Sequence, residues 1–333
     1  MSERGRRGVG GAGVLGVALL LSLAGCGRDD EAAAGGAGGR APDDDATSGA
    51  GNAATGGAAT SGAPNGGATT SSAGATGGPD DTPPPAGAIY VDPSLPEDDC
   101  ADYDPTSRAC GAGDSPAFRI LADAVAVATA GDTVVLREGI YQEPLVPTSS
   151  GVEGAPLTFR AFPGEAPTLT GDASPAMIQL LGVSHVIIDG LRVEDAPWLE
   201  AQDAHHNVVR YCDFDSTPAT GTTGNVRFVQ SDDNLVLGNR IHAGNDDLLL
   251  IDSERNVVED NDISEGGHSV FGIRCGDRNV IRGNRFANSL QKIGEVYDCG
   301  EDTSAVPNSF DSTRQNLIEG NEFTATDRYY STS

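Results

Sequence analysis

The chain has 333 residues and a formal net charge of −28, from 49 acidic side chains against 21 lysines and arginines. Such an excess of negative charge makes nucleic acid and bare anionic lipid poor partners. It also repels an acidic polysaccharide unless a metal ion or a local arginine patch intervenes.

The first 25 residues predict an export signal. Three arginines precede an apolar run, residues 14–23, which is too short to cross a membrane as a helix. The ending Leu-Ala-Gly-Cys26 resembles the lipobox of bacterial lipoproteins, which implies cleavage before Cys26 and acylation of that cysteine. Gly27 follows where an aspartate would retain the protein at the inner membrane, so the resemblance implies the outer membrane or cell surface. An ordinary signal peptide cut nearby is the alternative.

Residues 26–87 are predicted to form a disordered tether. They are Gly, Ala, Ser, Thr and Pro with scattered Asp, and so they bury too little apolar surface to offset the entropy of ordering. The run Pro83-Pro84-Pro85 stiffens the end of the tether. The remaining residues, 88–333, suit one solenoid or one large β domain.

A strand and a helix are predicted at the start of this domain. Residues 89–91 are apolar and short, as in a strand. Ser115 is a suitable N-cap and Pro116 suits the first turn of a helix, whose apolar stripe runs from Phe118 to Ala128. We expect this amphipathic helix to cap the open N-terminal end of a solenoid. Strands at 133–136 and 157–161 follow.

A repeat of about 22 residues then fills the second half of the chain. Five segments align without gaps, and they begin at Asn207, Asn234, Asn256, Asn279 and Asn316. The steps between these residues are 27, 22, 23 and 37. Three short strands and three corners fit one such repeat, so the long steps are turns that carry inserted loops. The period predicts a parallel β-helix whose turns stack about 4.8 Å apart.

A second asparagine recurs inside each repeat. Because an amide group both donates and accepts, stacked asparagines satisfy one another along an interior column. Cys212 takes this place in the 207 repeat, and we predict a buried free thiol there. The next position alternates in charge from turn to turn and predicts an outward salt ladder, with a binding face as the alternative. The predicted asparagine ladder is Asn239, Asn261, Asn284 and Asn321, and the charged column is Asp213, Arg240, Asp262, Arg285 and Glu322.

The residues from Gly131-Asp-Thr-Val-Val-Leu to Tyr141, with Arg-Ala-Phe-Pro-Gly164 and Gly171, resemble the opening of secreted proteins of the pectin-lyase-like superfamily. With the repeats, the resemblance spans about residues 88–325. It implies an all-β fold, a right-handed single-stranded parallel β-helix. It implies little about activity, because this fold carries lyases, hydrolases, epimerases and adhesins.

The cysteines after the signal predict two disulfides, which an exported location permits. Cys100 and Cys110 flank a loop rich in Asp and Pro. Cys299 lies in the long insertion, and Cys275 lies on the turn before it. We therefore expect the pairs Cys100–Cys110 and Cys275–Cys299, with Cys212 left reduced.

One local match points to a hydrolase. The segment Gly-Asn-Asp246-Asp247, one turn before Gly-Gly-His268, resembles the polygalacturonase family of glycoside hydrolases. The resemblance implies that Asp246 and Asp247 supply the acid and base carboxyl groups and that His268 orients the site. The third aspartate of that family is absent from Thr-Gly-Asn225, and its downstream Arg-Ile-Lys is absent too. Ordinary corner residues are therefore the alternative.

A polysaccharide lyase is the second enzymatic hypothesis. It needs a base for the proton beside the uronate carboxyl and a cation for the enolate. Arg274 is the best-placed candidate base. The Lys and Glu pattern of alginate and chondroitin lyases is absent around it. Calcium is the candidate cofactor, with possible ligands at neighbouring corners in Asp232, Asp233, Asp252 and Glu254.

Together these features predict an exported, membrane-anchored β-helix protein that acts on or binds extracellular polysaccharide or a cell-surface glycan. Loops after the 207 and 279 repeats would wall a groove on one outer face. The alternative is a non-catalytic, adhesin-like surface rod that binds glycan or protein.

Changing Cys26→Ser should release the protein from membranes, because stable anchoring requires the acyl chains on that residue. Membrane fractionation followed by immunoblotting measures the release. A wild-type chain that is already in the soluble fraction or the medium would contradict lipidation.

Overall fold

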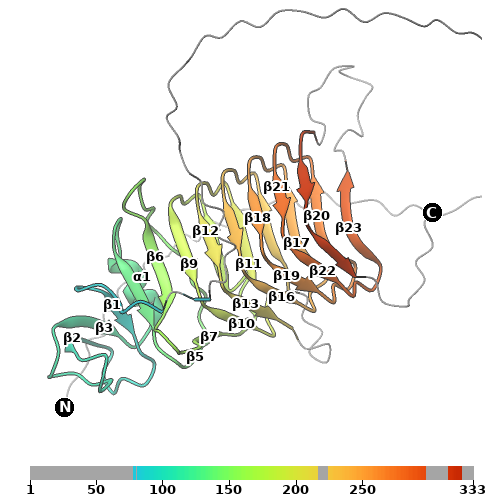
Figure 1. The fold of residues 1–333 in the computed structure, drawn as a ribbon. Coiled ribbons are helices and arrows are strands. Elements are labelled where there is room, and N and C mark those ends of the chain that lie inside the picture. The colour runs from blue at the N-terminus through green and yellow to red at the C-terminus, as the bar shows by residue number, and fades with distance from the viewer. Residues whose placement is uncertain (1–77, 80, 217–223, 298–313, 325–333) are drawn as a thin grey trace, which may run out of the picture. The chain divides into compact units, whose positions relative to one another are not determined.

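Parallel β-strands wind into a solenoid in the computed structural model, which describes residues 78–79, 81–216, 224–297 and 314–324. About nine turns stack along the axis, and their strands make three sheets (Figure 1). The predicted all-β parallel solenoid is confirmed.

The eleven-stranded sheet has the order β2-β3-β1-β4-β6-β9-β12-β15-β18-β21-β24. Its pairs are parallel except β2 with β3. The strands are β1 (Ile89–Val91), β2 (Asp99–Tyr103), β3 (Ser115–Phe118), β4 (Thr133–Leu136), β6 (Leu157–Ala161), β9 (Val186–Asp189), β12 (Val208–Arg210), β15 (Leu235–Leu237), β18 (Val257–Glu259), β21 (Val280–Arg282) and β24 (Leu317–Glu319).

The other two sheets are entirely parallel. The eight-stranded sheet holds β5 (Ile140–Tyr141), β7 (Thr168–Leu169), β10 (Arg192–Glu194), β13 (Asp213–Asp215), β16 (Arg240–His242), β19 (Asp262–Ser264), β22 (Arg285–Ala287) and β25 (Glu322–Thr324). The six-stranded sheet holds β8 (Ile178–Leu181), β11 (Leu199–Gln202), β14 (Val226–Val229), β17 (Asp246–Ile251), β20 (Ser269–Arg274) and β23 (Lys292–Tyr297).

Asparagine side chains bond one turn to the next inside the coil. Asn239 Nδ2 donates to Asn261 Oδ1 at 2.9 Å, Asn261 to Asn284 at 2.9 Å and Asn284 to Asn321 at 3.0 Å. The same acceptor oxygens also take the backbone N–H of the preceding asparagine. The ladder therefore satisfies amide groups at a corner where the strand ladder is interrupted.

Each corner that leads into this ladder needs a left-handed residue. The backbone φ is +63° at Gly238, +55° at Asp260 and +67° at Gly283, directly before the asparagines. Glycine adopts this conformation without steric cost, and aspartate tolerates it. The result is a sharp bend between the eleven-stranded and eight-stranded sheets at the same place in each turn.

The N-terminal helix differs from its prediction. Ser115 and Pro116 lie in strand β3, and the helix α1 spans only Leu121–Val127, without a side-chain cap. Pairing of β3 with β1 and β2 overrides the capping preference of Ser115. Its capping role stays a prediction. Within the described residues, no helix is long and apolar enough to cross a membrane.

The cysteines agree in part with the predicted pairs. Cys100 and Cys110 form a disulfide, and Cys212 is a buried free thiol. Cys275 is disulfide-bonded. Its expected partner, Cys299, lies outside the described residues, so that pairing stays a prediction.

The contacts of the solenoid begin ahead of residue 88. Arg160 Nη2 donates to the carbonyl of Thr82 at 3.2 Å, and the Ala88 N–H donates to the carbonyl of Pro85 at 3.1 Å. These residues, which the sequence assigns to the tether, therefore lie against the domain.

Asp247 is the unusual residue of the interior. Its side chain is fully buried, and Oδ1 accepts the Gly244 N–H at 2.7 Å, whereas Oδ2 has no hydrogen-bond partner among the described residues. Glycines on adjacent turns make room for it: a Cβ would lie 2.6 Å from Oδ1 at Gly244 and 2.9 Å from Oδ2 at Gly266. Burial raises the pKa of Asp247 well above its ordinary value of 3.8, and Asp246 and Glu265 add to the rise. The carboxyl group is therefore held in its neutral form.

This buried proton makes stability depend on pH. The unfolded chain releases it above about pH 4, whereas the folded chain keeps it, so the free energy of unfolding falls as the pH rises. In Asp247→Asn this contribution disappears, and the variant should lose less stability than the wild type between about pH 4 and about pH 7. The difference is at most about 1.4 kcal/mol per pH unit.

Urea denaturation at several pH values measures this effect. The exposed Asp262→Asn, at the surface of β19, is the matched control and should follow the wild type. An Asp247→Asn variant with the pH dependence of the wild type would refute a buried neutral carboxyl group.

Candidate functional site

Three adjacent strands of the six-stranded sheet bring the candidate residues to equivalent positions. In the parallel register Asp246 of β17 pairs with Ser269 of β20, and Ser269 pairs with Lys292 of β23. Each step is 23 residues, or one turn. The ends of these strands therefore place side chains from three successive turns side by side.

Asp246 and His268 form a hydrogen-bonded pair at this position. His268 Nδ1 lies 2.7 Å from Asp246 Oδ1, and the same oxygen accepts the hydroxyl of Ser269 at 2.7 Å. A carboxylate acceptor favours the tautomer with the proton on Nδ1, which leaves the Nε2 lone pair available. The His268 side chain is 36% exposed, against 23% for Asp246. The pair therefore presents one oriented, accessible imidazole.

Glu295 and Lys292 complete the cluster from the next turn. Glu295 Oε2 lies 4.0 Å from His268 Nδ1, and Lys292 forms an ion pair with Glu295. The sequence interpretation missed both residues, because the 37-residue step to Asn316 hides the register of this turn. The spacing of 23 from Asp246 to Ser269, repeated once more, would have found Lys292, the only lysine of the chain.

Asp247 is separated from this cluster, which corrects the expectation of two carboxyl groups on one substrate. Asp247 and Leu248 are both buried, so the in-and-out alternation fails where the chain enters β17. The consequence is that Asp246 faces outward and Asp247 faces the interior beside Gly244. One accessible carboxyl group is left where the hydrolase interpretation needs two.

Arg274 is also separated from the His268 imidazole. It lies at the other end of β20, five residues beyond Ser269, or about 17 Å of extended strand. Its side chain is exposed, and its strand neighbours are Ile251 and Tyr297. The structure thus brings Asp246 and His268 together and leaves Asp247 and Arg274 apart from them.

A second ionisable pair lies further along the same outer face. Glu200 of β11 is opposite Arg227 of β14, with Arg227 Nη1 3.7 Å from Glu200 Oε2. Burial raises the pKa of Glu200, while the charge of Arg227 works in the opposite direction. Between this pair and Glu295, Leu249 covers Gly272, where a Cβ would lie 2.8 Å from Leu249 Cδ2. The middle of the face is therefore flat and partly apolar.

The loops expected to wall this face lie mostly outside the described residues. Residues 217–223 connect β13 to β14, and residues 298–313 connect β23 to β24. Both insertions begin or end on the six-stranded sheet, as expected from the long repeat steps. That they wall a groove stays a prediction.

The acidic residues considered for calcium do not fit a cation site. Arg255 makes ion pairs with three of them, and the fourth, Asp252, accepts a hydrogen bond from Gln230. Among the residues that the structure describes, no group of three His, Cys, Asp or Glu could hold a metal ion. The three carboxylates bound by Arg255 are Asp232, Asp233 and Glu254.

The histidines outside the cluster do not converge on a metal position either. The rings of His185 and His206 stack with centroids 5.0 Å apart and planes 13° apart. Their nitrogen lone pairs lie in the ring planes, so the two rings face each other without sharing a donor point. His205 Nδ1 accepts the Asp232 N–H at 3.0 Å.

Comparisons with known proteins agree with the fold. The family model described as periplasmic copper-binding protein (NosD) matches residues 169–333. The pectate lyase PEL9 of Emericella nidulans is 28% identical over 215 residues, which are 62% of this chain and 48% of that protein. The uncharacterized protein YwoF of Bacillus subtilis is 36% identical over 84 residues, 23% of this chain and 18% of that protein. This chain thus spans about half or less of these relatives.

Among solved structures, the alginate lyase of Paenibacillus sp. covers 62% of this chain and 95% of its own, with 15% identity and a TM-score of 0.39. The family model and the pectate lyase relative, with the observed parallel solenoid, support a place for this chain in the NosD- and pectate-lyase-like superfamily of right-handed β-helices.

Proposed function

We propose that this chain is an exported, membrane-anchored β-helix protein that acts on extracellular polysaccharide at the outer face of its six-stranded sheet. The observation that carries the proposal is the Asp246–His268 pair, which holds one accessible imidazole on that face. The named activity of the pectate lyase relative is consistent with a polysaccharide partner.

Proton transfer is the chemistry that the pair supports. Asp246 fixes the Nδ1 proton of His268, so Nε2 accepts a proton from a bound sugar. The hydrolysis route with two carboxyl groups needs a second accessible acid, and Asp247 is buried. Elimination needs a single base, which removes the proton beside a uronate carboxyl while the bond to the next sugar breaks and a double bond forms. A uronate-containing polysaccharide is therefore the proposed substrate.

Positive charge near the pair supports an acidic substrate despite the net charge of −28. Lys292 lies one turn beyond His268, and Arg274 is exposed at the far end of β20. These cations offset the acidic groups Asp246 and Glu295 at the place where a uronate would bind.

Location and anchoring rest on the sequence. The export signal, Cys26 and the tether that follows support a chain held at the outer membrane or cell surface by acyl groups. The description of NosD as periplasmic fits an exported protein. Copper is not part of the proposal, because the described residues do not form a site that fits it.

The experiment compares His268→Asn with the wild type on polygalacturonate, alginate and neutral glycans, each with and without calcium. Products with a new double bond absorb in the ultraviolet, and reducing ends report any chain cleavage. We expect His268→Asn to lower the rate by roughly a hundredfold or more, and Asp246→Asn to lower it by roughly tenfold or more by releasing the tautomer.

Two variants serve as controls. His242 forms a similar pair with Asp215 at 3.3 Å on the eight-stranded sheet, so His242→Asn should keep the wild-type rate. Asp247→Asn should also keep it, because that carboxyl group lies inside the coil. A rate lost in Asp247→Asn and kept in His268→Asn would move the chemistry to a different group. Binding of a polysaccharide without turnover in the wild type would instead support the non-catalytic surface rod.

A further inference from the structure

A short proline-rich segment crosses the outer face of the eleven-stranded sheet. Near one end, a Cβ on Gly190 would lie 3.1 Å from Pro79 Cβ. In the middle, Thr82 accepts the hydrogen bond from Arg160, and at the other end Pro85 accepts the Ala88 N–H. The segment therefore runs from the corner after β9 to the start of β1.

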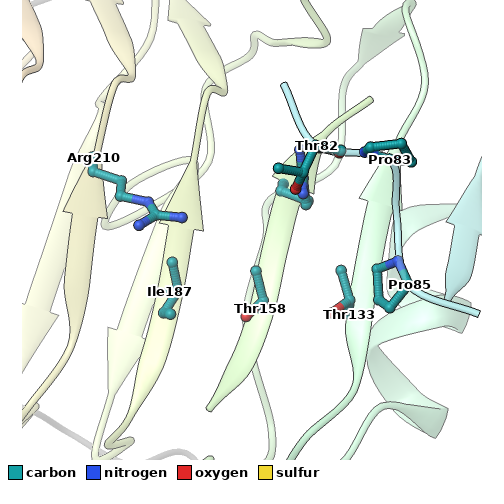
Figure 2. Close-up of a pocket in the computed structure, with 8 residues that line it drawn as sticks. Thr82, Pro83, Pro85, Thr133, Thr158, Ile187 and Arg210 are labelled. Atoms are coloured by element: carbon teal, nitrogen blue, oxygen red, sulfur yellow. Dashed lines mark hydrogen bonds between the residues drawn. The ribbon is translucent and has the colours of Figure 1, made fainter. Parts of the chain in front are cut away.

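A groove of about 280 Å³ lies between this segment and the sheet. Figure 2 shows Thr82, Pro83 and Pro85 beside the strands, with Arg210 reaching across from β12. The floor is formed by Thr133, Thr158 and Ile187, which occupy one outward column on adjacent strands. The volume is close to the lower end for small-molecule sites and suits one sugar ring.

The floor offers hydroxyl groups that the protein does not use. Thr133 and Thr158 are half-buried, and neither hydroxyl has a hydrogen-bond partner among the described residues. A half-buried hydroxyl without a partner is available to donate to and accept from a ligand hydroxyl.

Positive charge lines the same groove. Arg160, Asp189 and Arg210 are consecutive in one column of the sheet. Arg210 holds Asp189 Oδ2 through Nε at 3.0 Å and Nη2 at 2.7 Å. Its Nη1 group takes no part in this ion pair. Asp189 is 1% exposed and sits beneath, so the lining contains two arginines and no acidic side chain.

We propose that this groove binds a single sugar acid, a hexuronate, at the outer face of the eleven-stranded sheet. Its carboxylate pairs with the Nη1 group of Arg210, in the field of Arg160. Its hydroxyl groups bond with Thr133 and Thr158, and its apolar ring face packs against the proline segment. In a chain of net charge −28, such a groove is a local exception that attracts an anion.

The site is independent of the proposed active site. It lies on a different sheet from Asp246 and His268, and it uses none of their residues. Sugar-acid binding in this groove would retain a product or the end of a chain beside the point where the tether meets the domain.

Isothermal titration calorimetry on the purified full-length chain tests the proposal with sodium galacturonate, galactose and inorganic phosphate. We expect saturable binding of galacturonate and much weaker binding of the other two. The double variant Asp189→Asn/Arg210→Gln removes the charge without leaving an unpaired ion, and should weaken binding by roughly tenfold or more. His268→Asn should bind galacturonate as the wild type does, which separates this test from that of the active site.

Two matched controls keep the test sharp. Glu259 and Arg282 form a similar ion pair further along the same column, so Glu259→Gln/Arg282→Gln should leave binding unchanged.

A second pair of variants avoids the buried ion pair altogether. Ile187→Glu places a negative charge in the groove and should abolish binding, whereas Leu235→Glu, two strands along the same outward column, should not. The proposal is overturned by no binding in the wild type, by equal effects of a variant and its control, or by phosphate that binds as tightly as galacturonate.

Discussion

The amide ladder inside the coil is the interaction on which the rest of the structure depends. Each asparagine of the column bonds the next turn through its side chain and also satisfies a backbone N–H there. A shift of one residue between turns would leave several buried amide groups without partners, at a cost of about 1–3 kcal/mol for each. The ladder therefore fixes the register of successive turns, and with it every outward column.

That register explains why a functional cluster can form from residues far apart in the chain. Asp246, Ser269 and Lys292 are each one turn apart and meet only because the turns stack without slippage. The same constraint aligns Arg160, Asp189 and Arg210 on another face. Rigid strands hold these side chains more precisely than flexible loops could.

The repeat made the fold and the ladder predictable, because a recurring Asn at a fixed position has one physical explanation in a stacked coil. The site was predictable only in part. Asp246 and His268 followed from a local motif, but Asp247 was assigned to the surface because the bend before Leu248 leaves no sequence signal. Ser115 looked like a helix cap because its pairing with β2 and β1 is a tertiary effect.

The claim that His268 is an oriented base is tested most directly by nitrogen-15 NMR of the imidazole groups, with and without a uronate oligosaccharide. The account predicts that His268 carries its proton on Nδ1 and that its Nε2 signal shifts when the oligosaccharide binds, while the signals of His242 stay in place. A proton on Nε2 in the free protein, or a His268 signal that the oligosaccharide leaves unchanged, would contradict it.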